Sequence, residues 1–91
     1  MPRFMVESYP VGLSVTQLAA AADRAQDVTA QMRVDGVQVQ LLHSILVPTE
    51  ESLFCLFEAP SRELVEEIVN RAGLPRERVV EAVDVGSKGG S

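Results

Sequence analysis

Two segments with the apolar spacing of an α-helix alternate with strand-forming segments: one before the first helix, two between the helices and one after the second. This order constrains the fold more than any other feature. Apolar residues recur at steps of three and four between residues 15 and 32 and again between residues 64 and 72. Strand-forming residues fill 3–9, 37–47, 52–58 and 79–85, with prolines and glycines between the segments. The predicted order is therefore β-α-β-β-α-β.

Both predicted helices carry signals at their ends. Ser14 and Gln17 have the spacing of a capping box, and Ser61 is a favourable N-cap for the second helix. Gly36 and Gly73 follow the helices and suit the positive φ with which helices often end. The expected buried positions are Val15, Leu18, Ala22, Ala25, Val28 and Met32 in the first helix and Leu64, Val65, Ile68, Val69 and Ala72 in the second.

This order predicts an α+β fold, the ferredoxin-like sandwich, in which a four-stranded antiparallel sheet carries two helices on one face. We expect residues 1–86 to form a single domain, because 91 residues rarely supply two hydrophobic cores. Residues 87–91, which are rich in glycine and serine, are expected to be a flexible tail.

The second and third predicted strands are apolar on both faces, although two helices can cover only one face of a sheet. In segment 52–58, Leu53, Cys55 and Phe57 alternate with Phe54 and Leu56. Segment 37–47 also carries apolar residues at odd and even positions. We therefore expect a homodimer in which a second copy covers the spare face and forms an α+β barrel, the alternative being a monomer with an exposed apolar face.

The net charge, the apolar runs and the cysteine count limit the partners and the compartment that can be expected. Eight Lys and Arg against 13 Asp and Glu give a net charge of −5, which argues against nucleic acid as a partner. No run is apolar and long enough to span a membrane, so no membrane partner is expected. Cys55 is the only cysteine and sits among apolar residues, which predicts a buried thiol in a cytoplasmic protein.

His43, the only histidine, is the first candidate for chemistry, since an imidazole can move protons or bind a metal near neutral pH. It is expected to share a strand face with Leu41 and Ile45, where a purely structural role is equally open. Glu7 interrupts an apolar strand and shares its face with Tyr9. In an apolar cavity its pKa would be raised and it could act as a base, whereas at a sheet edge it would be solvated.

The segments PRFMVES, QLLHS, LFCLFEAPSRELVEE and NRAGLPRERVVEAVDV resemble the bacterial family called domain of unknown function 4242. The resemblance extends over nearly the whole chain, to about residue 85. It implies a ferredoxin-like fold, a dimer and, for some members, nickel binding. His43, in the His-Ser pair, is the residue that matches the family pattern well enough to carry a role over.

Two classes of function remain open alongside a dimer without any pocket. The first is a binding protein that holds a small ligand or a divalent metal such as nickel in the barrel or at the dimer interface, with His43 and Glu7 as metal ligands. The second is a cofactor-free α+β-barrel enzyme of the isomerase, cyclase or oxygenase type. There His43 would be the acid/base, helped by Glu7 or Tyr9, on a small apolar substrate. A cavity of a few hundred cubic ångströms containing His43 would favour either class.

Overall fold

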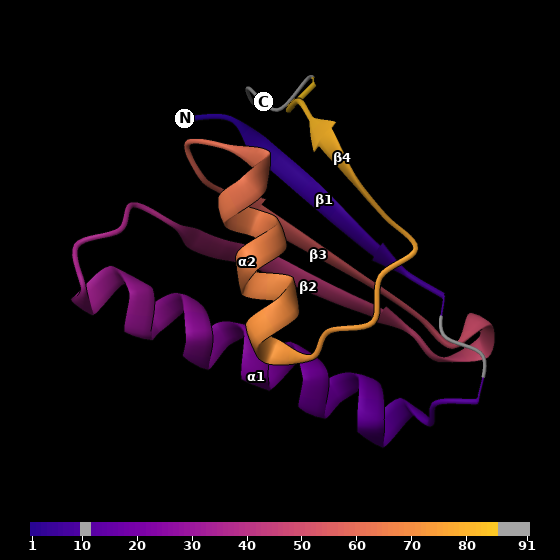
Figure 1. The fold of residues 1–91 in the computed structure, drawn as a ribbon. Helices are drawn as coiled ribbons and strands as arrows, with labels where there is room; N and C mark the ends of the chain where they lie inside the picture. Colours follow the sequence, from indigo (N-terminus) through magenta and orange to yellow (C-terminus); the bar gives the residue numbers. More distant parts are fainter. Residues whose placement is uncertain (10–11, 86–91) are drawn as a thin grey trace.

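Four strands form one antiparallel sheet in the order β2-β3-β1-β4, and two helices cover one of its faces (Figure 1). The computed structural model describes residues 1–9 and 12–85. In chain order the elements are β1 (Arg3–Ser8), α1 (Val15–Val34), β2 (Gln40–Val47), the 3-10 helix η1 (Pro48–Glu50), β3 (Ser52–Glu58), α2 (Arg62–Ala72) and β4 (Arg78–Ala82). The predicted ferredoxin-like α+β fold is confirmed.

Three strands are shorter than the sequence predicted. β1 ends at Ser8 instead of residue 9. β2 begins at Gln40 instead of residue 37, because the Val37 N–H donates to the Met32 carbonyl at 2.9 Å and so belongs to the end of α1. β4 ends at Ala82 instead of residue 85, because Ala82 pairs with Arg3, the residue at which β1 begins. The predicted tail at 87–91 lies outside the described residues.

The predicted helix ends are confirmed. The Ser14 Oγ accepts a hydrogen bond from the Gln17 N–H at 3.1 Å, and the Gln17 Oε1 accepts one from the Ser14 N–H at 2.9 Å. The Ser61 Oγ accepts a hydrogen bond from a backbone N–H in the first turn of α2 at 3.3 Å. Gly36 and Gly73 have φ values of 90° and 64°, where a side chain would strain the backbone.

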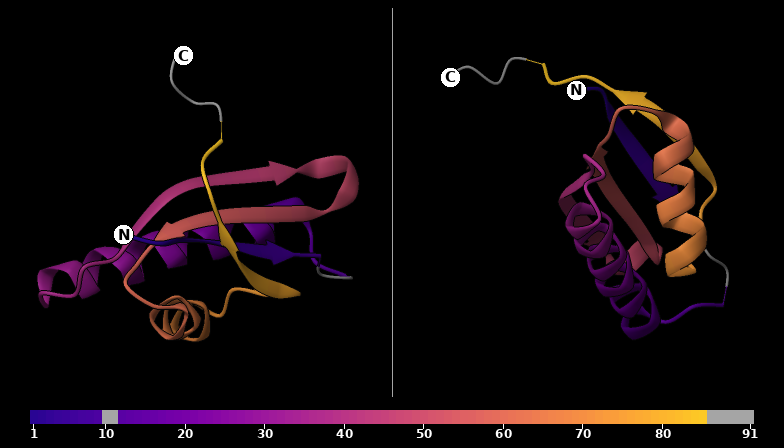
Figure 2. Two further views of the ribbon diagram at one scale, coloured as in Figure 1. Left: turned by 90° about the horizontal axis from the view of Figure 1, so that it is seen from above. Right: turned by 60° about the vertical axis from the view of Figure 1, so that its left-hand side comes forward.

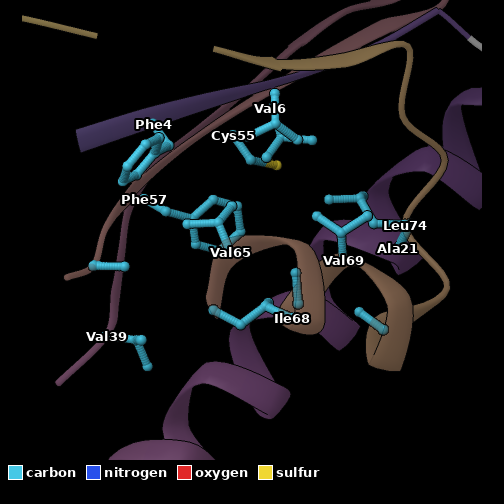
Figure 3. Packing of buried hydrophobic residues seen from close by; sticks show 14 of the residues in the cluster. Phe4, Val6, Ala21, Val39, Cys55, Phe57, Val65, Ile68, Val69 and Leu74 are labelled. Atoms are coloured by element: carbon cyan, nitrogen blue, oxygen red, sulfur yellow. The ribbon is translucent and has the colours of Figure 1, made fainter. Parts of the chain in front are cut away.

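The hydrophobic core lies between the sheet and the two helices (Figures 1 and 2). Among the side chains of this core, Figure 3 shows Phe57 of β3 close to Val65, Ile68 and Val69 of α2. All four are buried, and so is Ala72, as the spacing of α2 predicted; Leu64 packs against the core at its margin.

The buried side of α1 is rotated from its predicted position. Its buried residues are Leu18, Ala21, Ala25, Thr29 and Met32. Val15 is exposed, whereas Ala22 and Val28 are only partly buried. Thr29 can be buried because its hydroxyl donates to the Ala25 carbonyl at 2.7 Å, which satisfies the polar group within the helix.

A β-bulge in β2 decides which side chains face the core. Leu41 pairs with Phe57 and His43 pairs with Leu56, so Leu42 is an extra residue without a partner in β3. Leu41 packs against the core, while His43 lies on the side of the sheet away from the helices. The prediction that His43 shares a face with Leu41 is therefore wrong.

Candidate functional site: the open face of the sheet

The sheet face away from the helices, here called the open face, has no covering layer in the described residues. Its side chains come from all four strands and from Tyr9, which directly follows β1; they include Arg3, Met5, Glu7, Tyr9, Gln40, His43, Ile45, Phe54, Leu56, Glu58, Arg78, Val80 and Ala82. Strand register aligns His43, Leu56, Met5 and Val80 in one row across the sheet. The next row contains Ile45, Phe54, Glu7 and Arg78.

The centre of the open face is apolar. Ile45 is 56% exposed, and Met5, Phe54, Leu56 and Val80 are half-buried. Residues that pair across strands share one side of a sheet, so these five side chains form a continuous surface. The alternation in β3 agrees with the prediction, since Leu53, Cys55 and Phe57 are buried while Phe54 and Leu56 point to the open face. His43 and Ile45 share this face, as predicted.

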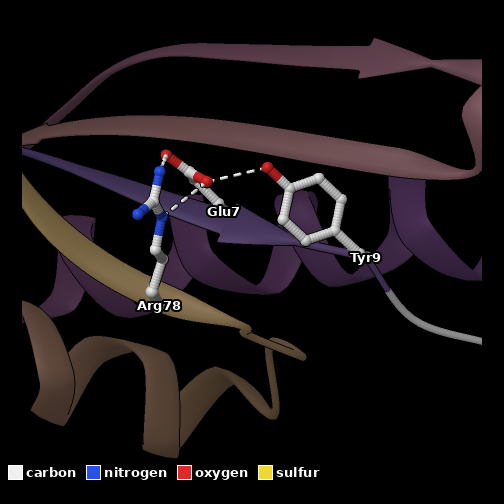
Figure 4. Close-up of polar contacts among 3 residues, drawn as sticks. All are labelled: Glu7, Tyr9 and Arg78. Atoms are coloured by element: carbon white, nitrogen blue, oxygen red, sulfur yellow. Dashed lines mark hydrogen bonds and ion pairs between the residues drawn. The ribbon is translucent and has the colours of Figure 1, made fainter.

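Glu7, Tyr9 and Arg78 form a polar cluster on this surface (Figure 4). The Arg78 Nε–H donates to the Glu7 Oε1 at 2.9 Å and its Nη2–H donates to the Oε2 at 3.3 Å. The Tyr9 hydroxyl donates to the Glu7 Oε1 at 2.7 Å. These two side chains cover the carboxylate, so that the Glu7 side chain is only 12% exposed while that of Arg78 is 63% exposed. Tyr9 also packs edge-on against Phe54, with ring centroids 5.9 Å apart.

The contacts within this cluster shift the pKa values of all three residues, and the shift of Glu7 is opposite to the one that a general base requires. Hydrogen bonds from Arg78 and then from Tyr9 hold the pKa of Glu7 below its ordinary value. The same contacts raise the pKa of Tyr9 and that of Arg78. A carboxylate with a lowered pKa is a weaker proton acceptor, so the cluster does not provide the raised pKa expected of a base in an apolar cavity.

Arg78 is the functional residue that the sequence analysis did not single out. It opens β4, and the antiparallel register of β1 and β4 places it directly opposite Glu7. Only the opposite charges of Glu7 and Arg78 were visible in the sequence, because their pairing depends on the register of β1 and β4.

A second pairing balances the charge of the open face. Arg3 forms ion pairs with Glu58, at 3.5 Å, and with Asp84 beyond the end of β4. Within the face, the guanidinium groups of Arg3 and Arg78 cancel the carboxylates of Glu7 and Glu58, whereas the whole chain carries a net charge of −5. The open face is therefore close to neutral on an acidic protein.

His43 is exposed on the open face, but it does not meet Glu7. Strand β3 lies between their strands, so two strand spacings of about 4.8 Å separate them, with Leu56 and Phe54 in between. Within residues 1–9 and 12–85, no group of three or more His, Cys, Asp or Glu side chains is arranged to hold a metal ion. A single copy, as far as it is described, supplies one imidazole and no complete metal centre.

The hollows found on the described surface lie elsewhere. One of about 230 Å³ lies between the start of α1 and the loop after α2, and Leu13, Ala20, Arg24 and Pro75 are among its lining residues. A shallow one of about 340 Å³ lies at the end of α1, beside Ala30 and Val34. Neither is lined by His43, so the enzyme hypothesis finds no substrate pocket in them.

Cys55 behaves as a buried small apolar residue, as predicted. Burial raises the pKa of its thiol, and the Ser44 hydroxyl, which donates to the Sγ at 3.6 Å, offsets part of that effect. Among the described helices, none has the length and apolar character to cross a membrane.

The fold and its uncovered face define a class of small ferredoxin-like α+β protein with an apolar sheet surface available for interaction. A family model described as "Nickel responsive protein SCO4226-like" matches residues 4–82, and the chain belongs to this family. The family's description names nickel, the metal that the sequence resemblance implied.

The solved structures include a relative with the same fold. The crystal structure of SCO4226 from Streptomyces coelicolor A3(2) matches with a TM-score of 0.72 at 24% sequence identity, covering 92% of this chain and 99% of that chain. At this identity the likeness establishes the fold. No curated protein matches the sequence.

Proposed function

We propose that this protein is a small homodimeric binding protein with a role linked to nickel, and that two copies associate through their open faces. Family membership supports the link to nickel. The proposal of a dimer rests on the apolar open face, where the exposed Ile45 adjoins a continuous surface of half-buried apolar side chains. A single, buried cysteine, Cys55, fits a reducing compartment, and we propose the cytoplasm.

The size of the open face suits a dimer of this kind. Four strands of five to eight residues, about 4.8 Å apart and at about 3.3 Å per residue, outline roughly 400 Å². Side chains that project from the sheet make its accessible area larger than this flat outline. The accessible area therefore approaches the value of about 800 Å² that each partner buries in a standard interface.

The charges of the open face also suit burial against a second copy. Burying an unpaired carboxylate is costly, but the Glu7 carboxylate already accepts three hydrogen bonds within its own chain. Because the charges of the face nearly cancel, two copies meet there with little repulsion despite the net charge of −5 on each chain.

We further propose that His43 supplies the nickel-binding imidazole. Imidazole nitrogen is a suitable ligand for nickel, and association through the open faces brings two copies of His43 to one interface. The oxygens of Glu7, the second predicted ligand, already accept hydrogen bonds from Arg78 and Tyr9, so we assign Glu7 to the charge pairing of the face.

The metal proposal is tested on protein without a histidine tag, by native mass spectrometry and by titration with nickel chloride. We expect a dimer that binds nickel, loss of nickel binding in His43→Ala with the dimer retained, and no change in Gln40→Ala, an exposed residue of the same strand. Nickel binding that survives in His43→Ala would refute His43 as the ligand. Absence of nickel binding in the wild type would refute the metal role.

The dimer is tested separately by sedimentation velocity. Ile45→Asp places a charge in the apolar part of the open face and is expected to give a folded monomer. Val34→Asp is the matched control, because Val34 is 80% exposed on α1, on the helix side of the sheet, and the dimer should persist. A monomeric wild type, or a dimer unaffected by Ile45→Asp, would refute association through this face.

A further inference from the structure

The segment that follows β4 exposes two large apolar side chains. Val83 is 79% exposed and Val85 is 87% exposed. β1 begins at Arg3, opposite Ala82, so residues 83–85 have no strand of their own sheet to pair with. This segment, here called the C-terminal arm, therefore leaves its valines uncovered by its own copy.

The C-terminal arm extends from the sheet on the side of the open face, away from the helices. In the left panel of Figure 2, the yellow segment after β4, residues 83–85, leaves the sheet on the side away from α2. Asp84, between the two valines, is ion-paired to Arg3, which belongs to the open face. This ion pair places the arm at the rim of the open face, beside the position of a layer that would cover it.

We propose that the C-terminal arm clasps the second copy, with Val83 and Val85 of each chain packing on its partner beside the open face. This inference rests on the proposed homodimer and assigns part of its interface to residues outside the sheet. The occupant is a second copy because the arm is continuous with the rim of the face on which that copy is proposed to sit. Asp84 is ion-paired to Arg3, so the valines can be buried without leaving this carboxylate unpaired.

The test uses the full chain and compares the dimer dissociation constant of the wild type with that of the double variant Val83→Ser/Val85→Ser by sedimentation equilibrium. Both valines are exposed within their own copy, so the changes are expected to leave the far-UV circular dichroism spectrum unaltered. We expect the dissociation constant to rise at least tenfold. Val34→Ser, at a similarly exposed valine on α1, is expected to leave it unchanged.

Amide hydrogen exchange provides a second measurement on the unaltered protein. If the arm clasps a partner, the amides of residues 83–85 exchange more slowly at concentrations where the dimer forms than at concentrations where it dissociates. A wild-type dimer whose dissociation constant is the same in the double variant, and whose arm amides are unprotected, would overturn this inference and leave the proposed dimer intact. A wild type that is monomeric at every concentration would overturn the dimer itself.

Discussion

Leu41 and His43 point to opposite sides of the sheet although only two positions separate them in β2. In a regular strand, residues two apart share a face. The extra residue Leu42 reverses the side chains that follow it, so Leu41 packs against the core while His43 reaches the open face. The bulge thus determines that the chain's only imidazole is accessible to a partner or a metal.

Deleting Leu42 is expected to preserve the pairing of β2. The partners of Leu41 and His43 are the consecutive residues Phe57 and Leu56, so removal of the residue between them leaves a regular ladder. We expect a cost of no more than about 2 kcal/mol in the free energy of unfolding, measured in urea, since no core contact is removed. Deleting Cys55 from β3, whose pairing with β1 is regular, is the control and should prevent folding, because the side chains on one side of the deletion would turn to the other face of the sheet.

Truncating Ile68 should reveal how much the helix side of the sheet contributes to stability. Ile68 is fully buried on α2, and Ile68→Ala is expected to lower the free energy of unfolding by about 2–5 kcal/mol through lost burial and the cavity left behind. Val15→Ala, at an exposed position of α1, should cost less than about 0.5 kcal/mol. Similar urea midpoints for the two variants would contradict the observed packing.

The Glu7 cluster predicts a particular dependence of stability on pH. Because folding lowers the pKa of Glu7 from its ordinary value of 4.5, the cluster stabilises the protein above that pH. This stabilisation is lost as the pH falls through the lower, folded pKa. Glu7→Gln should therefore reduce the difference in urea midpoint between pH 6 and pH 3, whereas Glu50→Gln, in η1, serves as the control. An unchanged difference in Glu7→Gln would show that the Arg78 and Tyr9 contacts do not act in solution.

Arg24 joins the two helices by binding the end of α2. Its Nε–H donates to the Ala72 carbonyl at 2.6 Å and its Nη2–H donates to the Gly73 carbonyl at 3.4 Å. Arg24→Gln should lower the free energy of unfolding by about 1 kcal/mol, because carbonyls at a helix C-terminus lose a charged donor. Thermal unfolding followed by circular dichroism would measure the effect. Arg33→Gln, in the last turn of α1, controls for the change in charge.

Much of the fold could be predicted because local chemistry and tertiary structure agree in most elements. Ser14, Gln17, Ser61 and Gly73 act at helix ends in ways that depend on their own backbone and near neighbours. The burial pattern of β3 follows simple alternation. The open apolar face was likewise visible, since Phe54 and Leu56 occupy positions that the helices do not cover.

The errors occur where the sequence pattern is ambiguous. α1 is rich in alanine, so its apolar stripe is weak, and packing against the sheet selects Ala21 over Ala22. In β2, Leu41 and Leu46 lie an odd number of residues apart, yet both pack against the core, which only a bulge permits. That odd spacing was a usable signal for the bulge. The Glu7–Arg78 pair depends on register between distant strands, which alternation along one strand does not determine.

The bulge in β2 has a consequence for how large an assembly can grow. β2 is an edge strand, and the unpaired backbone groups of an edge strand offer a place for further chains to add by hydrogen bonding. The irregular spacing around Leu42 interrupts that edge, so a regular strand cannot match it along its whole length. The proposed association through the open faces is self-complementary and would close at two copies. A chain built in this way can present an apolar surface to a second copy while its edge at β2 resists the addition of a further strand.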